Sequence, residues 1–159
     1  VPTKGTTEWI WKEMLPVEIT KELLNTYRSK KDEIREIEWR LNNRWRDDNM
    51  IGNDVILDYS KGYPMPQSVV GFDQEKYERQ QDKDIRRKLG LEKECEAMEE
   101  FVDSIQDSIT RRIFLMSFLE KRKKSQREIA RVVHLDRSNI SKKIDKYLKN
   151  AQKSQKSHL

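Results

Sequence analysis

The spacing of apolar residues along the chain predicts two long helices. Residues 17–46 contain no glycine or proline, and their apolar residues recur at steps of about three and four, the period of one helix face. This stripe contains Ile19, Leu23, Tyr27, Ile34, Leu41 and Trp45, widened by Leu24 and Ile37. The pattern resumes behind the candidate N-cap Asp73 and runs to residue 104. Its regular part contains Leu91, Cys95, Met98, Val102 and Ile105.

Two heptad-like helices of similar length predict an antiparallel coiled-coil hairpin over residues 17–104. The same apolar stripes would also suit pairing with a second chain, which would make the protein a homo-oligomer, most simply a dimer. Both arrangements follow from the pattern, and the spacing does not choose between them.

The helical period is lost between the two predicted helices, in residues 47–72. This stretch holds three of the five glycines and two of the four prolines of the chain, and a loop of this length is typically functional or disordered. Apolar residues from Met50 to Val70 argue against complete disorder. We therefore expect an irregular insert that is partly ordered and folds back on the adjoining helices.

The two ends of the chain have their own patterns. Residues 1–16 form an N-terminal arm, in which residues 7–15 predict a short helix with Trp9, Ile10 and Met14 on one side, stopped by Pro16. Residues 151–159 are polar and of low complexity, so we expect a flexible, frayed basic tail. Lys153 and Lys156 in this tail would add non-specific attraction to phosphates.

Residues 105–150 predict a domain of three short helices. Asp107 is the expected cap of the first, which runs to about Glu120 with Ile109, Ile113, Phe114 and Phe118 as its apolar face. Ser125 followed by Glu128 has the spacing of a capping box, so the second helix begins there and ends near Val133. Asp136 caps the third. The fold class expected for the chain is therefore all-α: the helical hairpin followed by this three-helix domain.

The second and third of these helices have the pattern of a helix-turn-helix. The residues expected to be buried between them are Ile129, Val133, Leu135, Ile140 and Ile144, with Ala130 as the small residue that lets the helices approach. The turn position is usually glycine because the backbone there is left-handed. This chain has His134, which is among the few other residues that tolerate this conformation.

Hydrogen-bonding and basic side chains remain on the outside of this predicted unit. They are of the types that bind phosphates and base edges. The candidate DNA-binding residues are Ser125, Gln126, Arg127, Arg137, Ser138, Asn139, Ser141, Lys142, Lys143 and Lys146. The alternative is that these residues form only the solvated face of a basic helical hairpin.

Charge is divided unevenly along the chain, which supports a nucleic-acid partner for the C-terminal part. Residues 1–104 carry 18 Lys and Arg against 23 Asp and Glu, whereas residues 105–159 carry 15 against 5. An excess of positive charge on a predicted helix-turn-helix is typical of nucleic-acid binding. For the acidic part we expect an ordinary solvated surface.

Catalysis and membrane insertion are disfavoured by what the composition lacks. The two histidines are His134 in a turn and His158 in the tail, which provides no material for a metal cluster or a Ser-His-Asp triad. We therefore expect no enzyme activity and no cofactor. Cys95 is the single cysteine, and we expect it to be a small core residue of a cytoplasmic protein. No apolar run is long enough for a membrane span.

The stretch DSITRRIFLMSFLEKRKKSQREIARVVHLDRSNISKKIDKYL resembles region 4 of sigma-70-type factors. The resemblance implies that the second motif helix reads the major groove with Arg137, Ser138, Asn139, Ser141 and Lys142. The order of predicted elements over residues 17–150 is similar to small phage- and prophage-encoded regulators of Gram-positive bacteria of the RinA and ArpU types. That similarity implies an activator of late phage genes that binds promoter double-stranded DNA and contacts RNA polymerase. The alternative is a small terminase subunit, which would bind phage DNA for packaging.

Overall fold

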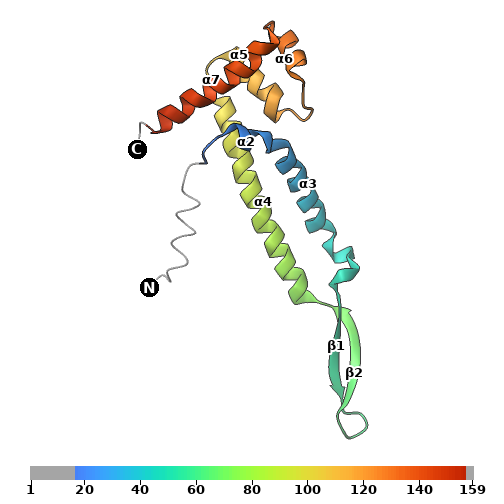
Figure 1. The fold of residues 1–159 in the computed structure, drawn as a ribbon. Helices are drawn as coiled ribbons and strands as arrows, with labels where there is room; N and C mark the ends of the chain where they lie inside the picture. The colour runs from blue at the N-terminus through green and yellow to red at the C-terminus, as the bar shows by residue number, and fades with distance from the viewer. Residues whose placement is uncertain (1–16, 157–159) are drawn as a thin grey trace. The chain divides into compact units, whose positions relative to one another are not determined.

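The computed structural model describes residues 17–156, which are mostly helical and include one two-stranded β-hairpin (Figure 1). They form two compact units. The first consists of residues 17–30 and 93–156, and the second of residues 31–92. The expectation of a mostly helical fold is confirmed. The expectation that the fold is all-α is corrected, because the chain also contains two strands. The predicted N-terminal arm, residues 1–16, lies outside the described residues.

The first predicted helix is interrupted near its beginning. It is divided into α2 (Lys21–Asn25) and α3 (Tyr27–Asn43), and Thr26 separates the two. Thr20 caps α2 by accepting a hydrogen bond from the Leu23 N–H, and the Thr26 hydroxyl donates to the Leu23 carbonyl at 2.6 Å. Such side-chain bonds to the backbone compete with regular helical bonding, which explains a break that apolar spacing does not indicate.

Within the second unit, α3 runs antiparallel to α4 (Gln74–Asp103). The ion pairs show the direction, because Glu33 contacts Arg87 whereas Arg44, further along the chain, contacts Asp84. Arg44 is buried and also donates to Gln81 at 2.7 Å. A coiled-coil geometry for the whole pair of helices stays a prediction.

The apolar stripes are buried in their regular parts and fail near the insert. Leu91, Cys95, Met98 and Val102 on α4 are buried, as predicted, and so is Ile105 just after this helix. Leu89 of α4 is 60% exposed. The apolar spacing predicts Trp45 on the buried stripe of the first helix, and this prediction is wrong. It lies in the 3-10 turn η1 (Arg44–Arg46), where the period changes, and it is 59% exposed with the Arg46 guanidinium 4.6 Å from its ring centre.

The insert 47–72 is a β-hairpin, which corrects the expectation of an irregular loop. After the turn η2 (Asp48–Met50), strand β1 (Ile51–Asp58) pairs antiparallel with β2 (Met65–Phe72). Ile51 lies opposite Phe72, and Gly62 provides positive φ in the turn between the strands. The glycines and prolines had masked a period of two, which is the strand period. Asp73 then caps α4, as predicted, by accepting from the Lys76 N–H at 3.0 Å.

The first unit contains α5 (Ser108–Phe114), the π-helical segment η3 (Leu115–Leu119), α6 (Gln126–Val133) and α7 (Arg137–Lys156). Aromatic rings join three helices at its centre. Phe114 of α5 lies 6.2 Å from Phe101 of α4 and 5.5 Å from Tyr147 of α7, measured between ring centres. The end of α4 is therefore part of the same core as the C-terminal helices.

Residues 17–30 also belong to this unit. Arg28 donates to the carbonyls of Glu120 and Ser117 at 2.7 and 3.0 Å, so it satisfies carbonyls at the end of η3. Lys21 forms an ion pair of 2.7 Å with Asp145 of α7. Residues 17–30 therefore pack with the C-terminal helices and complete the unit that contains the predicted helix-turn-helix.

Three expectations for the C-terminal part need correction. Asp107 caps α5 as predicted, but the α-helix ends at Phe114 and continues as η3 instead of running to about Glu120. Ile109, placed on the apolar face, is 40% exposed. Residues 151–156 of the expected frayed tail are helical, because α7 continues to Lys156; residues 157–159 lie outside the described part.

Candidate nucleic-acid interface

The N-terminus of α6 has the predicted capping box. The Ser125 hydroxyl accepts from the Glu128 N–H, and the Glu128 carboxylate accepts from the Ser125 N–H at 2.7 Å. Two otherwise unpaired N–H groups of the helix start are satisfied in this way. These hydrogen bonds lower the pKa of Glu128, and the charge of Arg122 lowers it further. The carboxylate that fixes the beginning of α6 is thus held in its charged form.

His134 adopts the left-handed conformation that the pattern requires at the end of α6. Its φ and ψ are 56° and 44°, and it is the one non-glycine residue with positive φ in the described part of the chain. Its N–H and that of Leu135 both bond to the Ala130 carbonyl. The side chain is exposed, so the residue acts here through its backbone and closes α6 before α7 begins.

One face of α7 is buried and the opposite face is basic and polar. Ile140, Ile144 and Leu148 recur every four residues and are at most 5% exposed. Helical geometry places Ser138 and Lys142 on the opposite side, and both are exposed. Lys149 and Lys153 continue that exposed side towards the end of the helix. The helix carries seven Lys and Arg residues and one Asp.

The predicted site residues fall into two groups by exposure. Seven are exposed: Ser125, Gln126, Arg127, Arg137, Ser138, Lys142 and Lys146. Three are half-buried: Asn139, Ser141 and Lys143. The hydroxyl of Ser125 is engaged in the capping box, whereas the exposed residues of α7 lie along a single helix. The predicted residues of α7 thus share one helix, whereas the side chain of Ser125 has the structural role of capping α6.

Three acidic side chains near α7 and α6 interact with neighbouring groups. Asp145 pairs with Lys21, and Glu128 pairs with Arg122 at 2.9 Å. Asp107 accepts two hydrogen bonds from Thr110, which lower its pKa, and the charge of Lys143 lowers it further. A carboxylate close to a cation repels a polyanion less than an isolated carboxylate would. The positive charge of α7 therefore dominates this surface.

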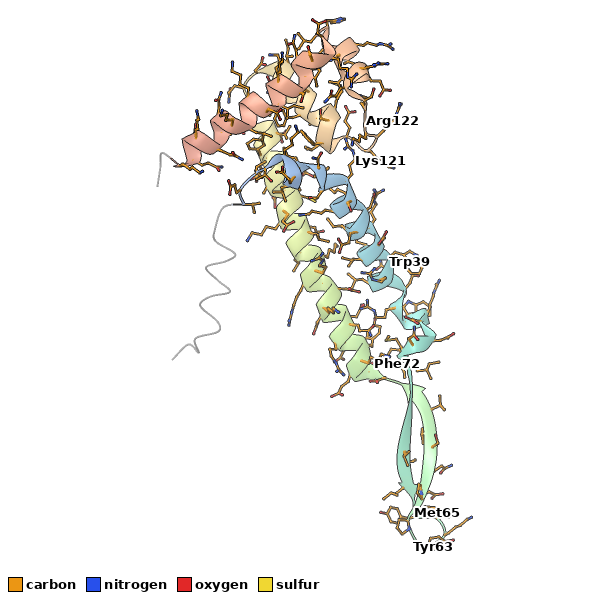
Figure 2. All side chains as sticks on the ribbon, in the orientation of Figure 1. Trp39, Tyr63, Met65, Phe72, Lys121 and Arg122 are labelled. Carbon is orange, nitrogen blue, oxygen red and sulfur yellow. The ribbon has the colours of Figure 1, made fainter. Side chains whose placement is uncertain are left out.

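Further cations lie before and on α6 and are not among the predicted site residues. The loop before α6 carries Lys121 to Lys124 in succession, and Figure 2 shows the side chains of Lys121 and Arg122 on that loop. Lys121 and Lys123 are exposed, and so is Arg131 on α6. The run of four cations directly before a helix cap was the signal in the sequence. It extends the basic surface beyond α7.

The remaining candidate sites are less specific. A hollow of about 420 Å³ in the second unit is lined by Trp39, Arg40, Asn43, Arg44, Arg46, Asp47 and Gln80. Among residues 17–156, no group of three or more His, Cys, Asp or Glu side chains is placed to hold a metal ion. No helix in the same range is both long and apolar enough to cross a membrane.

Comparisons with protein-family models, with curated proteins and with solved structures found no match for this chain.

Proposed function

We propose that the protein binds double-stranded DNA through α6 and α7 and regulates transcription. One observation carries the proposal: a capped helix, a left-handed turn at His134 and a second helix with a buried apolar face and an exposed basic face follow one another without a break. In helix-turn-helix proteins the second helix enters the major groove and its N-terminal residues contact bases. Here these are Arg137, Ser138 and Lys142.

The chemistry of the polar and basic residues of α7 divides them into two roles. Arg137 and Asn139 lie in the first turn of α7, where arginine and asparagine side chains can read base edges. Lys149 and Lys153 lie three or more turns further along, where an extended cation is suited to phosphates. The resemblance to sigma region 4 agrees with this division and supports promoter DNA as the target, with RNA polymerase as a protein partner.

The proposal predicts strong salt dependence of DNA binding. About six phosphate contacts give a slope of log K against log salt concentration of roughly −5. Fluorescence anisotropy with a labelled duplex, repeated at several salt concentrations, measures it. A nearly flat dependence would contradict binding through this basic surface.

Matched variants then separate base-specific contacts from non-specific attraction to phosphates. We expect Arg137→Ala and Asn139→Ala to reduce the difference between a duplex selected from a random library and an unrelated one, and Lys153→Ala to weaken both duplexes alike. Binding of all three variants should be compared at one salt concentration. If Lys153→Ala changed the preference among sequences as much as Arg137→Ala, α7 would not be oriented as proposed. Mapping the selected sequence to promoters tests the regulatory role.

A further inference from the structure

The β-hairpin has an exposed apolar face that the proposed function does not use. In a strand, successive side chains point to opposite sides, and the register places paired residues on the same side. Ile51 lies opposite Phe72, and Leu57 lies opposite Pro66. The side that carries Ile51, Val55, Leu57, Pro66, Val70 and Phe72 also carries Ser68, opposite Val55. We call it the apolar face because most of its residues are apolar.

The other side of the hairpin is different in chemistry. It carries Gly52, Ile56, Asp58, Met65, Gln67, Val69 and Gly71. Glycine and polar residues alternate there with single apolar ones, as on a solvated surface. Antiparallel sheets commonly solvate one face and pack the other on a core, and the hairpin has this asymmetry with its apolar side uncovered.

The apolar face is large enough to be an interaction surface. Its Ile, Val, Leu and Phe side chains are between 48% and 66% exposed. Five such side chains leave on the order of 500 Å² of apolar surface in water, a size at which patches are often functional. Two copies of this face would together remove roughly 1,000 Å² from water, which reaches the lower bound for a specific interface.

The hairpin also needs a cover for its own stability, because a single two-stranded hairpin is marginal in water. Its base is anchored: Met50 is buried, the Asp73 N–H donates to the Met50 carbonyl at 2.8 Å, and the Phe72 ring lies 5.4 Å from Tyr77. Figure 2 shows Phe72 at this base and Met65 with Tyr63 at the far end. The strands between have only each other in the described sheet.

We propose that the apolar face of the hairpin packs against the same face of a second copy of this chain, forming a two-fold symmetric dimer. Across a two-fold axis a surface packs against its own copy, so a face with a net charge of one sign would repel its partner. This face contains no charged residue, which favours self-association and disfavours both a nucleic acid and a partner chosen by charge. The dimer is thus formed by the hairpin, and it does not depend on DNA binding.

Adjacent residues of β2 provide a matched test. Val70 is on the apolar face and is 66% exposed, whereas Val69 is on the other side and is 39% exposed. Val70→Glu would place two charges in the dimer interface, and we expect the dimer dissociation constant to rise at least a hundredfold. Val69→Glu should change it by less than about threefold.

Sedimentation equilibrium of the full chain without DNA, from about 1 to 100 µM, measures the mass. The wild-type protein and Val69→Glu should approach twice 19.2 kDa, and Val70→Glu should stay at the monomer mass with an unchanged helical circular dichroism spectrum. If Val70→Glu loses helical signal, Val70→Thr takes its place, because threonine keeps the strand-forming shape; it should weaken the dimer about tenfold.

Three outcomes would overturn the proposal. These are a wild-type protein that is monomeric at every concentration, an assembly larger than a dimer, and equal effects of the substitutions at positions 69 and 70. Since no DNA is present in these measurements, none of these outcomes bears on the proposed DNA binding.

Discussion

At the residue scale, His134 has a left-handed backbone conformation that residues other than glycine rarely adopt. A non-glycine residue at φ of 56° carries a modest conformational cost, and a β-branched residue there would carry a much larger one. We expect His134→Gly to change the free energy of unfolding by about 1 kcal/mol or less, because relief of strain is offset by a looser unfolded chain. His134→Val should be clearly more destabilising. Thermal melts and DNA anisotropy on both variants check this.

The comparison also tests the exposed ring of His134. If the ring contacted DNA, glycine and valine would reduce binding alike while differing in stability. Equal destabilisation by the two substitutions would contradict the left-handed turn, and with it the placement of Arg137 to Lys142 on α7.

A second residue-scale prediction concerns the pKa of Asp84. Burial raises this pKa, but hydrogen bonds from Arg44 and Arg40 and their positive charges lower it more, to below the ordinary value of 3.8. A carboxylate whose pKa is lower in the folded state stabilises the fold above its ordinary pKa, and this contribution is lost as pH falls through the lowered value. Asp84→Asn should therefore cost about 2 kcal/mol at neutral pH, because Arg44 loses a charged acceptor.

The pH dependence separates this ion pair from other acid-sensitive groups. Urea unfolding at pH values from about 7 down to 2 should show the difference between the wild-type protein and Asp84→Asn shrinking below the ordinary carboxyl pKa. Asp58→Asn on the hairpin is the control, since the Asp58 carboxylate accepts hydrogen bonds from the nearby Ser60. A constant difference between wild type and Asp84→Asn across this pH range would show that the carboxylate charge is not what stabilises Arg44.

At the element scale, the capping box decides where α6 begins. Ser125→Ala removes the side-chain acceptor of the Glu128 N–H, and we expect a loss of about 1 kcal/mol of stability. Glu128→Gln keeps an acceptor for the Ser125 N–H, so it should cost less. Chemical denaturation of both variants measures the difference. A larger loss for Glu128→Gln would indicate that the ion pair with Arg122, and not the capping box, holds this helix start.

At the scale of the whole molecule, the helices proposed to bind DNA share their core with distant parts of the chain. Phe101 and Arg28 lie outside residues 105–156, yet they contact Phe114, Tyr147 and the end of η3. A fragment starting at residue 105 should therefore melt at a lower temperature than the full chain and less cooperatively, because its aromatic core is incomplete. Circular dichroism melts of both proteins test this. Equal melting behaviour would show that the three-helix domain is independent.

Local signals in the sequence determined the parts of the protein that depend on neighbouring residues. The caps at Asp73, Asp107 and Ser125, the turn at His134 and the buried stripe around Cys95 all follow from interactions within a few positions. These signals are strong because a helix end must satisfy its own N–H groups wherever it lies. The candidate DNA-binding residues of α7 were found in the same way, from their place between caps and buried positions.

Only the tertiary structure decided the features that depend on residues far apart in the chain. The pairing of residues 51–58 with 65–72 gives the insert its strands, and a two-residue period among glycines and prolines is too weak to predict it alone. Arg28 meets the end of η3, and Phe101 meets Tyr147, across separations that no local pattern encodes. Long-range packing sets these contacts, so the extent of the compact units and the exposed apolar face of the hairpin became visible only in three dimensions.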